Sequence, residues 1–334
     1  MASISFDKER KKKRKIIINQ RSFDFLKGVI IGICLMLFLF HFEGVVHVEN
    51  NLRHYETKDF RVSNDGWNSI SVYFGENSKL RGYSQVDQDK IILALTKEYR
   101  KRNKVSTSDF VPYFVDLAAN DATALSNTLL LEKSGWSGLC IEPNPIYWYG
   151  LANRKCDVAA AFIGGKTDMQ KVQVSLTNKE FGGIVAEGMD NSLEKMKRNE
   201  VDLPKETRYT ISIKSLFQKF QVPKSIEYFS LDVEGAEELI MKDFPFSDYV
   251  IRFLTIERPK PTLQALLEMK GYRFVMQLIY WGETLWVHQD VLIHLSMTEI
   301  KEIVNNVSRF AGKSGKGQMR FDLESGKYGY SQDK

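Results

Sequence analysis

Acidic residues stand directly after short apolar runs at three points of the sequence. Asp116, Glu142 and Asp232 each follow such a run, of which Leu139-Cys140-Ile141 is an example. Apolar runs of this length, bounded by turn-forming residues, are typical of buried strands. Parallel strands end at one edge of a sheet, so we expect the three carboxyl groups to converge on one crevice. The alternative is that each acid only caps the helix after its strand.

The turn after Asp116 consists of small and polar residues and leads into Leu129-Leu130-Leu131. A strand, a tight turn and a helix in this order place backbone N–H groups against a nucleotide-like ligand. Ala118 and Ala122 occupy positions where a dinucleotide fingerprint has glycine, which leaves less room for a pyrophosphate. The turn therefore favours an adenosine ligand that has no phosphates.

S-Adenosylmethionine carries the groups for which this crevice offers partners. Glu142 is placed to accept hydrogen bonds from a ribose diol, and acids attract a sulfonium and an ammonium group. Asn120, Ser126 and nearby backbone donors are suited to a carboxylate. The residues predicted to bind the cofactor are Asp116, Ala118, Asn120, Asp121, Ser126, Glu142 and Asp232.

Three acids are candidates for the catalytic base. Methyl transfer from a sulfonium needs in-line positioning and exclusion of water, and a hydroxyl acceptor also benefits from a base. Asp232, Glu234 and Glu257 lie at strand ends and suit this role, with His288 as a lesser candidate; Glu234 equally suits a helix cap. We predict no metal ligands. Asp87-Gln88-Asp89 has the Asp-x-Asp form of metal-dependent glycosyltransferases, but in the first turn of a predicted helix such acids offset the helix dipole.

The order of elements indicates a doubly wound α/β sheet. A helix over 87–102 is followed by alternating strands and helices from Val111 to about His288, which favours parallel strands with right-handed crossovers. Residues 178–208 are predicted to be an insertion or lid. After a capped helix that begins near Ser296, the Gly-, Ser- and Lys-rich segment from Ala311 is predicted to be disordered.

The N-terminal part has the features of a signal anchor. Residues 1–27 hold nine Lys/Arg and three acids, a net charge of +6, whereas the whole chain carries +5. The folded part is thus nearly neutral, which argues against a nucleic-acid partner. Residues 25–42 are apolar and span about 27 Å as a helix, enough to cross a thin bilayer. The basic tail (1–24) predicts a cytosolic N-terminus and a luminal C-terminal part. We expect that part to consist of a stem over 43–83, a domain over 84–295, and a C-terminal helix and tail over 296–334.

Two cysteines fall within the predicted luminal domain. Cys140 and Cys156 lie on neighbouring predicted strands, and an oxidising compartment permits a disulfide between them. Two free buried thiols remain the alternative.

The ordered motifs resemble those of the FkbM-type methyltransferase family. The resemblance rests on the segments 114–121, 125–128, 135–145 and 230–237, and Ser84-Gln85 with Asp87-Gln88-Asp89 is similar to an entry segment of membrane-anchored eukaryotic members. It implies a class I methyltransferase fold, with a seven-stranded sheet whose last strand is antiparallel, S-adenosylmethionine as cofactor and O-methyl transfer. It also implies that 116–121 is the cofactor loop, Glu142 the ribose acid and 232–237 the edge of the active site.

We therefore expect a type II membrane protein of the Golgi or endoplasmic reticulum with a luminal O-methyltransferase domain. Its expected acceptor is a hydroxyl of a glycan or a lipid-like molecule. One alternative is a catalytically silent luminal module that binds a secretory-pathway protein, because Ala118 and Ala122 depart from the family pattern. A glycosyltransferase is a further alternative.

Overall fold

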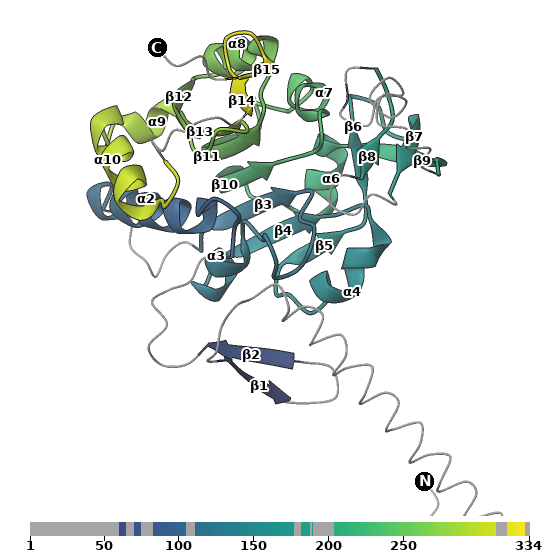
Figure 1. The fold of residues 1–334 in the computed structure, drawn as a ribbon, viewed down its shortest axis with the longest axis horizontal. Coiled ribbons are helices and arrows are strands. Elements are labelled where there is room, and N and C mark those ends of the chain that lie inside the picture. Colours follow the sequence, from purple (N-terminus) through teal and green to yellow (C-terminus); the bar gives the residue numbers. More distant parts are fainter. Residues whose placement is uncertain are drawn as a thin grey trace, which may run out of the picture. The chain divides into compact units, whose positions relative to one another are not determined.

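A seven-stranded sheet forms the centre of the computed structural model (Figure 1). The structure describes residues 60–64, 70–74, 83–104, 111–176, 182–187, 189, 204–311 and 319–330. The strand order is β12-β13-β11-β10-β3-β4-β5. These strands are β3 (Tyr113–Leu117), β4 (Ser137–Ile141), β5 (Asp157–Ala159), β10 (Ser225–Leu231), β11 (Val250–Glu257), β12 (Tyr272–Gln277) and β13 (Glu283–His288).

The direction of the strands agrees with the predicted sheet. Strands β5, β4, β3, β10 and β11 are parallel, whereas β13 pairs antiparallel with both β11 and β12. The doubly wound α/β class, the seven strands and the antiparallel last strand are therefore confirmed. Because β13 runs the other way, its first residue lies at the edge where the parallel strands end.

Alternating side chains of the central strands build a separate core on each face of the sheet. Val115, Phe229 and Leu254 face one core, while their neighbours Phe114 and Phe253 face the other. This alternation is a direct consequence of strand geometry. The first core is covered by α6 (Ile213–Lys219), α7 (Glu237–Lys242) and α8 (Pro261–Met269), and the second by α2 (Gln88–Arg102), α3 (Leu129–Lys133), η1 (Pro145–Tyr147), α4 (Trp148–Leu151), α9 (Gln289–Leu292) and α10 (Met297–Val307).

Helices α2 and α10 form where the sequence predicts them. Ile91, Ile92 and Leu95 of α2 recur at helical spacing and are fully buried. Helix α10 begins with a capping box, in which the Oγ of Ser296 accepts from the N–H of Glu299 and the Glu299 carboxylate accepts from Ser296. The two helices lie side by side (Figure 1).

A second, four-stranded sheet is inserted between β5 and β10. Its order is β6-β9-β7-β8, with β6 (Phe162–Gly164), β7 (Lys171–Ser175), β8 (Gly183–Ile184) and β9 (Glu206–Ser212). The segment from Asp157 to Gly164 therefore supplies two strands, β5 and β6, that belong to different sheets. The described part of the predicted lid (178–208) supplies β8 and the beginning of β9, and its remainder lies outside the described residues.

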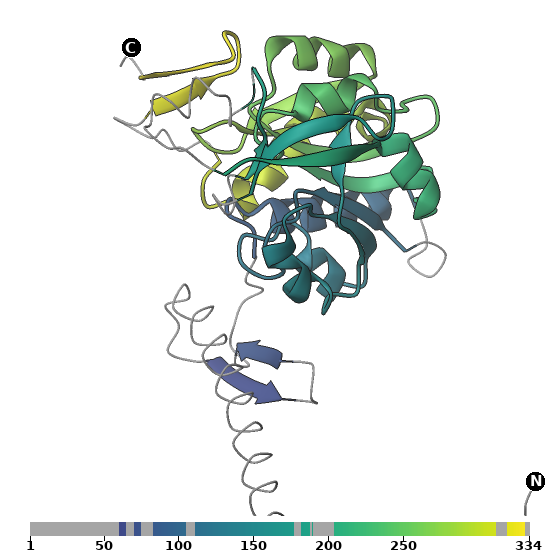
Figure 2. The same ribbon diagram turned by 90° about the vertical axis from the view of Figure 1, so that its right-hand side faces the viewer.

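The C-terminal segment contains a hairpin where the sequence predicts disorder. Strands β14 (Met319–Asp322) and β15 (Lys327–Tyr330) pair antiparallel (Figure 2). Phe321 is buried, and its N–H donates to the backbone oxygen of Tyr280 at 2.8 Å. The prediction of disorder is thus wrong for 319–330, because the hairpin is stabilised by contacts with the loop between β12 and β13.

The predicted basic tail and anchor lie outside the described residues, as does most of the stem. Within the described ranges, no helix is both long and apolar enough to cross a membrane. Two short strands of the stem, β1 (Phe60–Asn64) and β2 (Ile70–Phe74), pair with each other. The chain divides into two compact units, of which the second contains both sheets and the C-terminal hairpin.

Candidate active site

The loop after β3 contains a left-handed backbone conformation of the kind that glycine usually supplies. Ala118 has φ 66° and Asn120 has φ 54°, both in the left-handed region that non-glycine residues rarely adopt. The N–H of Ala118 donates to the backbone oxygen of Ile141 at 2.9 Å, which ties the loop to the end of β4. Ala122 is not among the described residues with positive φ, so only Ala118 takes on the strain of a missing glycine.

Glu142 is held against this loop from the neighbouring strand. Its Oε2 accepts from the N–H of Asn120 at 2.9 Å and its Oε1 from the N–H of Asn144 at 2.7 Å. The residue is only 5% exposed, and burial raises the pKa of its carboxyl group to about 7, although the two hydrogen bonds act in the opposite direction. The acid predicted to bind ribose is thus in direct contact with the predicted cofactor loop.

Asp121 and Ser126 act on the shape of the loop. The Asp121 carboxylate accepts from the N–H groups of Thr123 and Ala124, both at 2.8 Å. Ser126 is buried, and its Oγ accepts from the N–H of Leu129 at the start of α3. Both side chains therefore bind the backbone, as is typical of Asp and Ser at turns and helix starts.

Asp116 lies below the loop and does not face the open edge. It is the penultimate residue of β3 and only 2% exposed, and its Oδ2 accepts from the Oγ1 of Thr128 at 2.6 Å. Arg154 crosses over from the end of α4 and donates to Thr128 Oγ1 and to Ser126 Oγ, each at 3.1 Å. The same guanidinium forms a buried ion pair with Glu132, at 3.2 Å. Arg154, which sequence reasoning missed, therefore fixes the second half of the loop.

A disulfide stabilises the same region. Cys140, two residues before Glu142, is bonded to Cys156, and both are buried. The Glu132 carboxylate that binds Arg154 also accepts from the N–H of Cys156 at 3.1 Å. Of the two possibilities left open for these cysteines, the structure contains the disulfide.

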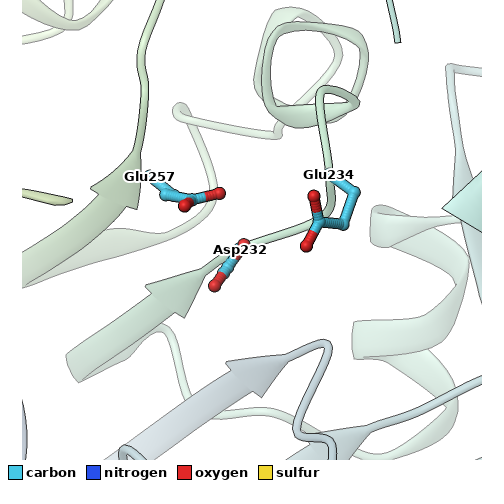
Figure 3. Close-up of side chains that lie close together, drawn as sticks. All are labelled: Asp232, Glu234 and Glu257. Carbon is cyan, nitrogen blue, oxygen red and sulfur yellow. The ribbon is translucent and has the colours of Figure 1, made fainter. Parts of the chain in front are cut away.

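Three carboxyl groups meet beyond the ends of β10 and β11 (Figure 3). One oxygen each from Asp232, Glu234 and Glu257 lies within 4.8 Å of the others. Arg258 forms ion pairs with Glu257 and, at 3.2 Å, with Glu234. The structure thus brings together the three predicted catalytic acids and adds a cation that sequence reasoning missed.

Burial and mutual repulsion make this cluster reluctant to ionise. Burial is the main reason that the pKa of Asp232 and of Glu257 is raised, and the neighbouring carboxylates raise both further. Glu283, the first residue of β13, pairs with Glu257 across the two strands, and burial raises its pKa as well. The sequence predicts a strand that ends at Glu257, and the family resemblance implies an antiparallel last strand, so the two together could have indicated the position of Glu283.

Two further candidates lie in structural roles. His288 stands at the far end of β13 from Glu283, where its Nδ1 accepts from the N–H of Asp290, so its prediction as a base is wrong. Asp87 forms ion pairs with Lys90 and Arg309, and Asp89 accepts from the hydroxyl of Ser84 at 2.7 Å. Both acids of the Asp-x-Asp sequence are therefore satisfied by protein groups, as the interpretation without a metal requires.

The sheet order and the site at its carboxyl edge define a methyltransferase-like α/β domain. Residues 116–276 match the family described as the methyltransferase FkbM domain. The chain thus contains an FkbM methyltransferase domain, and the family match indicates methyltransferase activity. A search of curated proteins found no match.

Proposed function

We propose that this domain transfers a methyl group from S-adenosylmethionine to a hydroxyl of a glycan or lipid-like acceptor. The observation that carries the proposal is the contact between the loop after β3 and Glu142, through the N–H of Asn120. It places an acid that suits ribose hydroxyls beside a loop of backbone donors at the carboxyl edge of a parallel sheet. This is the edge at which α/β sheets bind nucleotide-like ligands.

The remaining polar groups of the edge suit the cationic part of that cofactor. Asn127 donates from Nδ2 to Ser230 Oγ at 2.9 Å, which orients its amide. Its Oδ1 is buried and, within the described part of the chain, accepts no hydrogen bond. Such an acceptor needs a donor from a ligand, because a buried unpaired oxygen is costly. Asn127 and the acids after β10 would hold the ammonium group, and Glu142 the ribose.

The protein's part in the reaction is to orient the reactants and to take up a proton. The cofactor supplies a methyl group on a positively charged sulfur. An ionised carboxylate among Asp232, Glu234 and Glu257 would take up the proton of an acceptor hydroxyl, and the raised pKa of Asp232 and of Glu257 makes each a stronger base once it is ionised. Their partial burial limits contact with water, which strengthens each electrostatic contact.

We also propose a luminal position for the domain. The apolar segment 25–42 and the basic residues before it favour an anchor with a cytosolic N-terminus. The disulfide between Cys140 and Cys156 supports an oxidising compartment, where such bonds persist. Golgi and endoplasmic reticulum membranes meet both conditions.

Calorimetric titration of the full chain in detergent with S-adenosylmethionine tests the enzyme proposal. We expect one site, weakened at least about tenfold in Glu142→Ala, because the change removes charge-assisted hydrogen bonds of about 1.5–3 kcal/mol. The matched control is Glu227→Gln, a buried acid at the opposite end of β10, where affinity should not change. Absence of binding by the wild-type chain refutes the enzyme proposal.

The left-handed Ala118 favours a second candidate, a silent luminal module that binds a secretory-pathway protein. The same titration with Ala118→Gly separates the two functions. A variant that binds the cofactor when the wild-type chain does not would support the silent module. Equal binding by both would contradict it.

A further inference from the structure

The hairpin β14–β15 lies against two loops at the carboxyl edge of the main sheet. One loop joins β11 to α8, and the other joins β12 to β13; β12 and β11 both run antiparallel to β13, so both end at this edge. Gln264 of α8 donates from Nε2 to the backbone oxygen of Leu323 in the hairpin at 2.7 Å. The N–H of Phe321 donates to the backbone oxygen of Tyr280 in the second loop. The C-terminal hairpin is therefore part of the edge that carries the acids.

One glycine lies between the hairpin and these acids. The backbone oxygen of Gly282 accepts from the N–H of Arg258 at 2.9 Å. A Cβ on Gly282 would lie 2.7 Å from Cγ of Arg258 and 3.0 Å from the ring of Phe321, so a larger residue would displace one of them. Arg258 itself forms ion pairs with Glu234 and Glu257. The hairpin thus packs next to the residue that binds two of the acids.

Partly exposed aromatic side chains gather at this contact. Tyr280 and Trp281 are half-buried, and their rings meet edge to face with centroids 4.9 Å apart. The hydroxyl of Tyr328 donates to the backbone oxygen of Trp281 at 3.1 Å, while 42% of Tyr328 stays exposed. Its ring packs edge to face against the buried Phe321. We call Tyr280, Trp281 and Tyr328 the aromatic wall.

The composition of the aromatic wall suits a sugar ring better than a lipid chain. An aromatic side chain with a polar end can cover the C–H face of a sugar, while charged groups beside it bind the hydroxyls at the rim. Glu234, Glu257 and Arg258 are such groups at the same edge. A lipid chain needs a continuous apolar surface instead. The exposed side chains of the hairpin include four charged ones, Arg320, Asp322, Glu324 and Lys327.

We propose that the aromatic wall binds the acceptor of the methyl transfer and that this acceptor is a glycan. The sugar ring would stack on Trp281 and Tyr328, with one hydroxyl directed toward the acids after β10 and β11. In the transfer step the hydroxyl oxygen would bond to the methyl carbon as the carbon–sulfur bond breaks, and its proton would pass to one of the acids. The assignment rests on the proposed methyl transfer, because it names the acceptor of that reaction.

Saturation-transfer NMR of the full chain in lipid nanodiscs tests the proposal, with the methyl glycosides of glucose, galactose, mannose, fucose and N-acetylglucosamine as probes. We expect transfer to the C–H protons of at least one glycoside at millimolar concentration. Binding should be at least about fivefold weaker in Trp281→Ala and in Tyr328→Ala, because each change removes a stacking surface, whereas Tyr328→Phe keeps the ring and should bind within about twofold of the wild type. The matched control is Tyr209→Ala, a tyrosine of β9 that is 55% exposed, where binding should not change. Thermal melts of all variants show that they remain folded.

The proposal is overturned if no glycoside receives saturation from the wild-type chain, or if Trp281→Ala and Tyr328→Ala, still folded, bind it unchanged. It is also overturned if hexanol, a lipid-like probe, receives saturation that depends on Tyr328 while no glycoside does. The assay contains no S-adenosylmethionine. A chain that binds a glycoside through Tyr328 but no cofactor would refute methyl transfer and leave the sugar site standing, whereas cofactor binding with no glycoside bound would overturn the sugar site alone.

Discussion

Replacement of Ala118 by glycine should stabilise the protein, although it removes a side chain. Ala118 has φ 66°, a conformation that costs an L-residue roughly 1–2 kcal/mol. Glycine avoids this cost but loses about 0.5–1 kcal/mol through the greater freedom of the unfolded chain. The net gain is about 0.5–1 kcal/mol, which corresponds to a rise in melting temperature of about 1–4 °C for a domain of this size.

Ala122→Gly provides a matched control in the same loop. Ala122 is 8% exposed, and its Cβ packs against Gly150, where an added Cβ would lie only 3.2 Å away. Glycine there relieves no left-handed residue, leaves a small void and increases the freedom of the unfolded chain, a loss of about 1–2 kcal/mol. Chemical denaturation of the two variants gives both free energies of unfolding. If Ala118→Gly destabilises as much as Ala122→Gly does, the argument from backbone strain is wrong.

Three further predictions concern the support of the loop. Burial raises the pKa of Glu142 in the folded state to about 7, whereas its pKa in the unfolded chain is near 4.5. The folded state therefore binds this proton more tightly, and the stability that results is complete below pH 4.5 and is lost as the pH rises through 7. Relative to Glu142→Gln, the wild-type free energy of unfolding should therefore fall by about 2–3 kcal/mol from pH 4.5 to 8, and a difference independent of pH would contradict this. The Cys140–Cys156 disulfide closes a loop with a sequence separation of 16, and its loss should lower the free energy of unfolding by about 3 kcal/mol. Urea denaturation of the double Cys→Ala variant measures this loss. Equal urea midpoints for the wild type with and without reductant would show that the bond contributes nothing. Arg154→Met should lower the free energy of unfolding by about 3–5 kcal/mol, because it leaves Glu132 buried without its cation. Glu132→Gln in the same chain should restore part of the loss. Additive effects of the two changes in urea denaturation would show that the two residues do not interact.

Reasoning from the sequence placed side chains best where their position follows from the end of a strand. Asp232 and Glu257 stand at the ends of parallel strands, and topology alone brings them together. Asp116 escaped this reasoning, because β3 continues by one residue to Leu117. Asp116 therefore lies within the strand and is buried, and its carboxylate binds Thr128.

Contacts between distant segments were beyond the reach of the sequence. Arg154 reaches Ser126 and Thr128 across the loop, and no local pattern marks that pairing. The hairpin β14–β15 is similar, since its composition favours disorder and its order depends on the loop before β13. His288 was misplaced for a different reason: the reversal of β13 carries its last residue away from the site.

The position of β13 sets a limit on how the domain can be divided. The segment that matches the family ends at residue 276, inside β12, whereas β13 begins at Glu283 and lies between β11 and β12 in the sheet. A fragment that stops where the match stops would leave β12 without its neighbour and β11 with an unpaired edge. Exposed edges of this kind promote association between chains. The segment that matches the family and the segment that completes the seven-stranded sheet therefore differ in length here, and the second extends at least through His288.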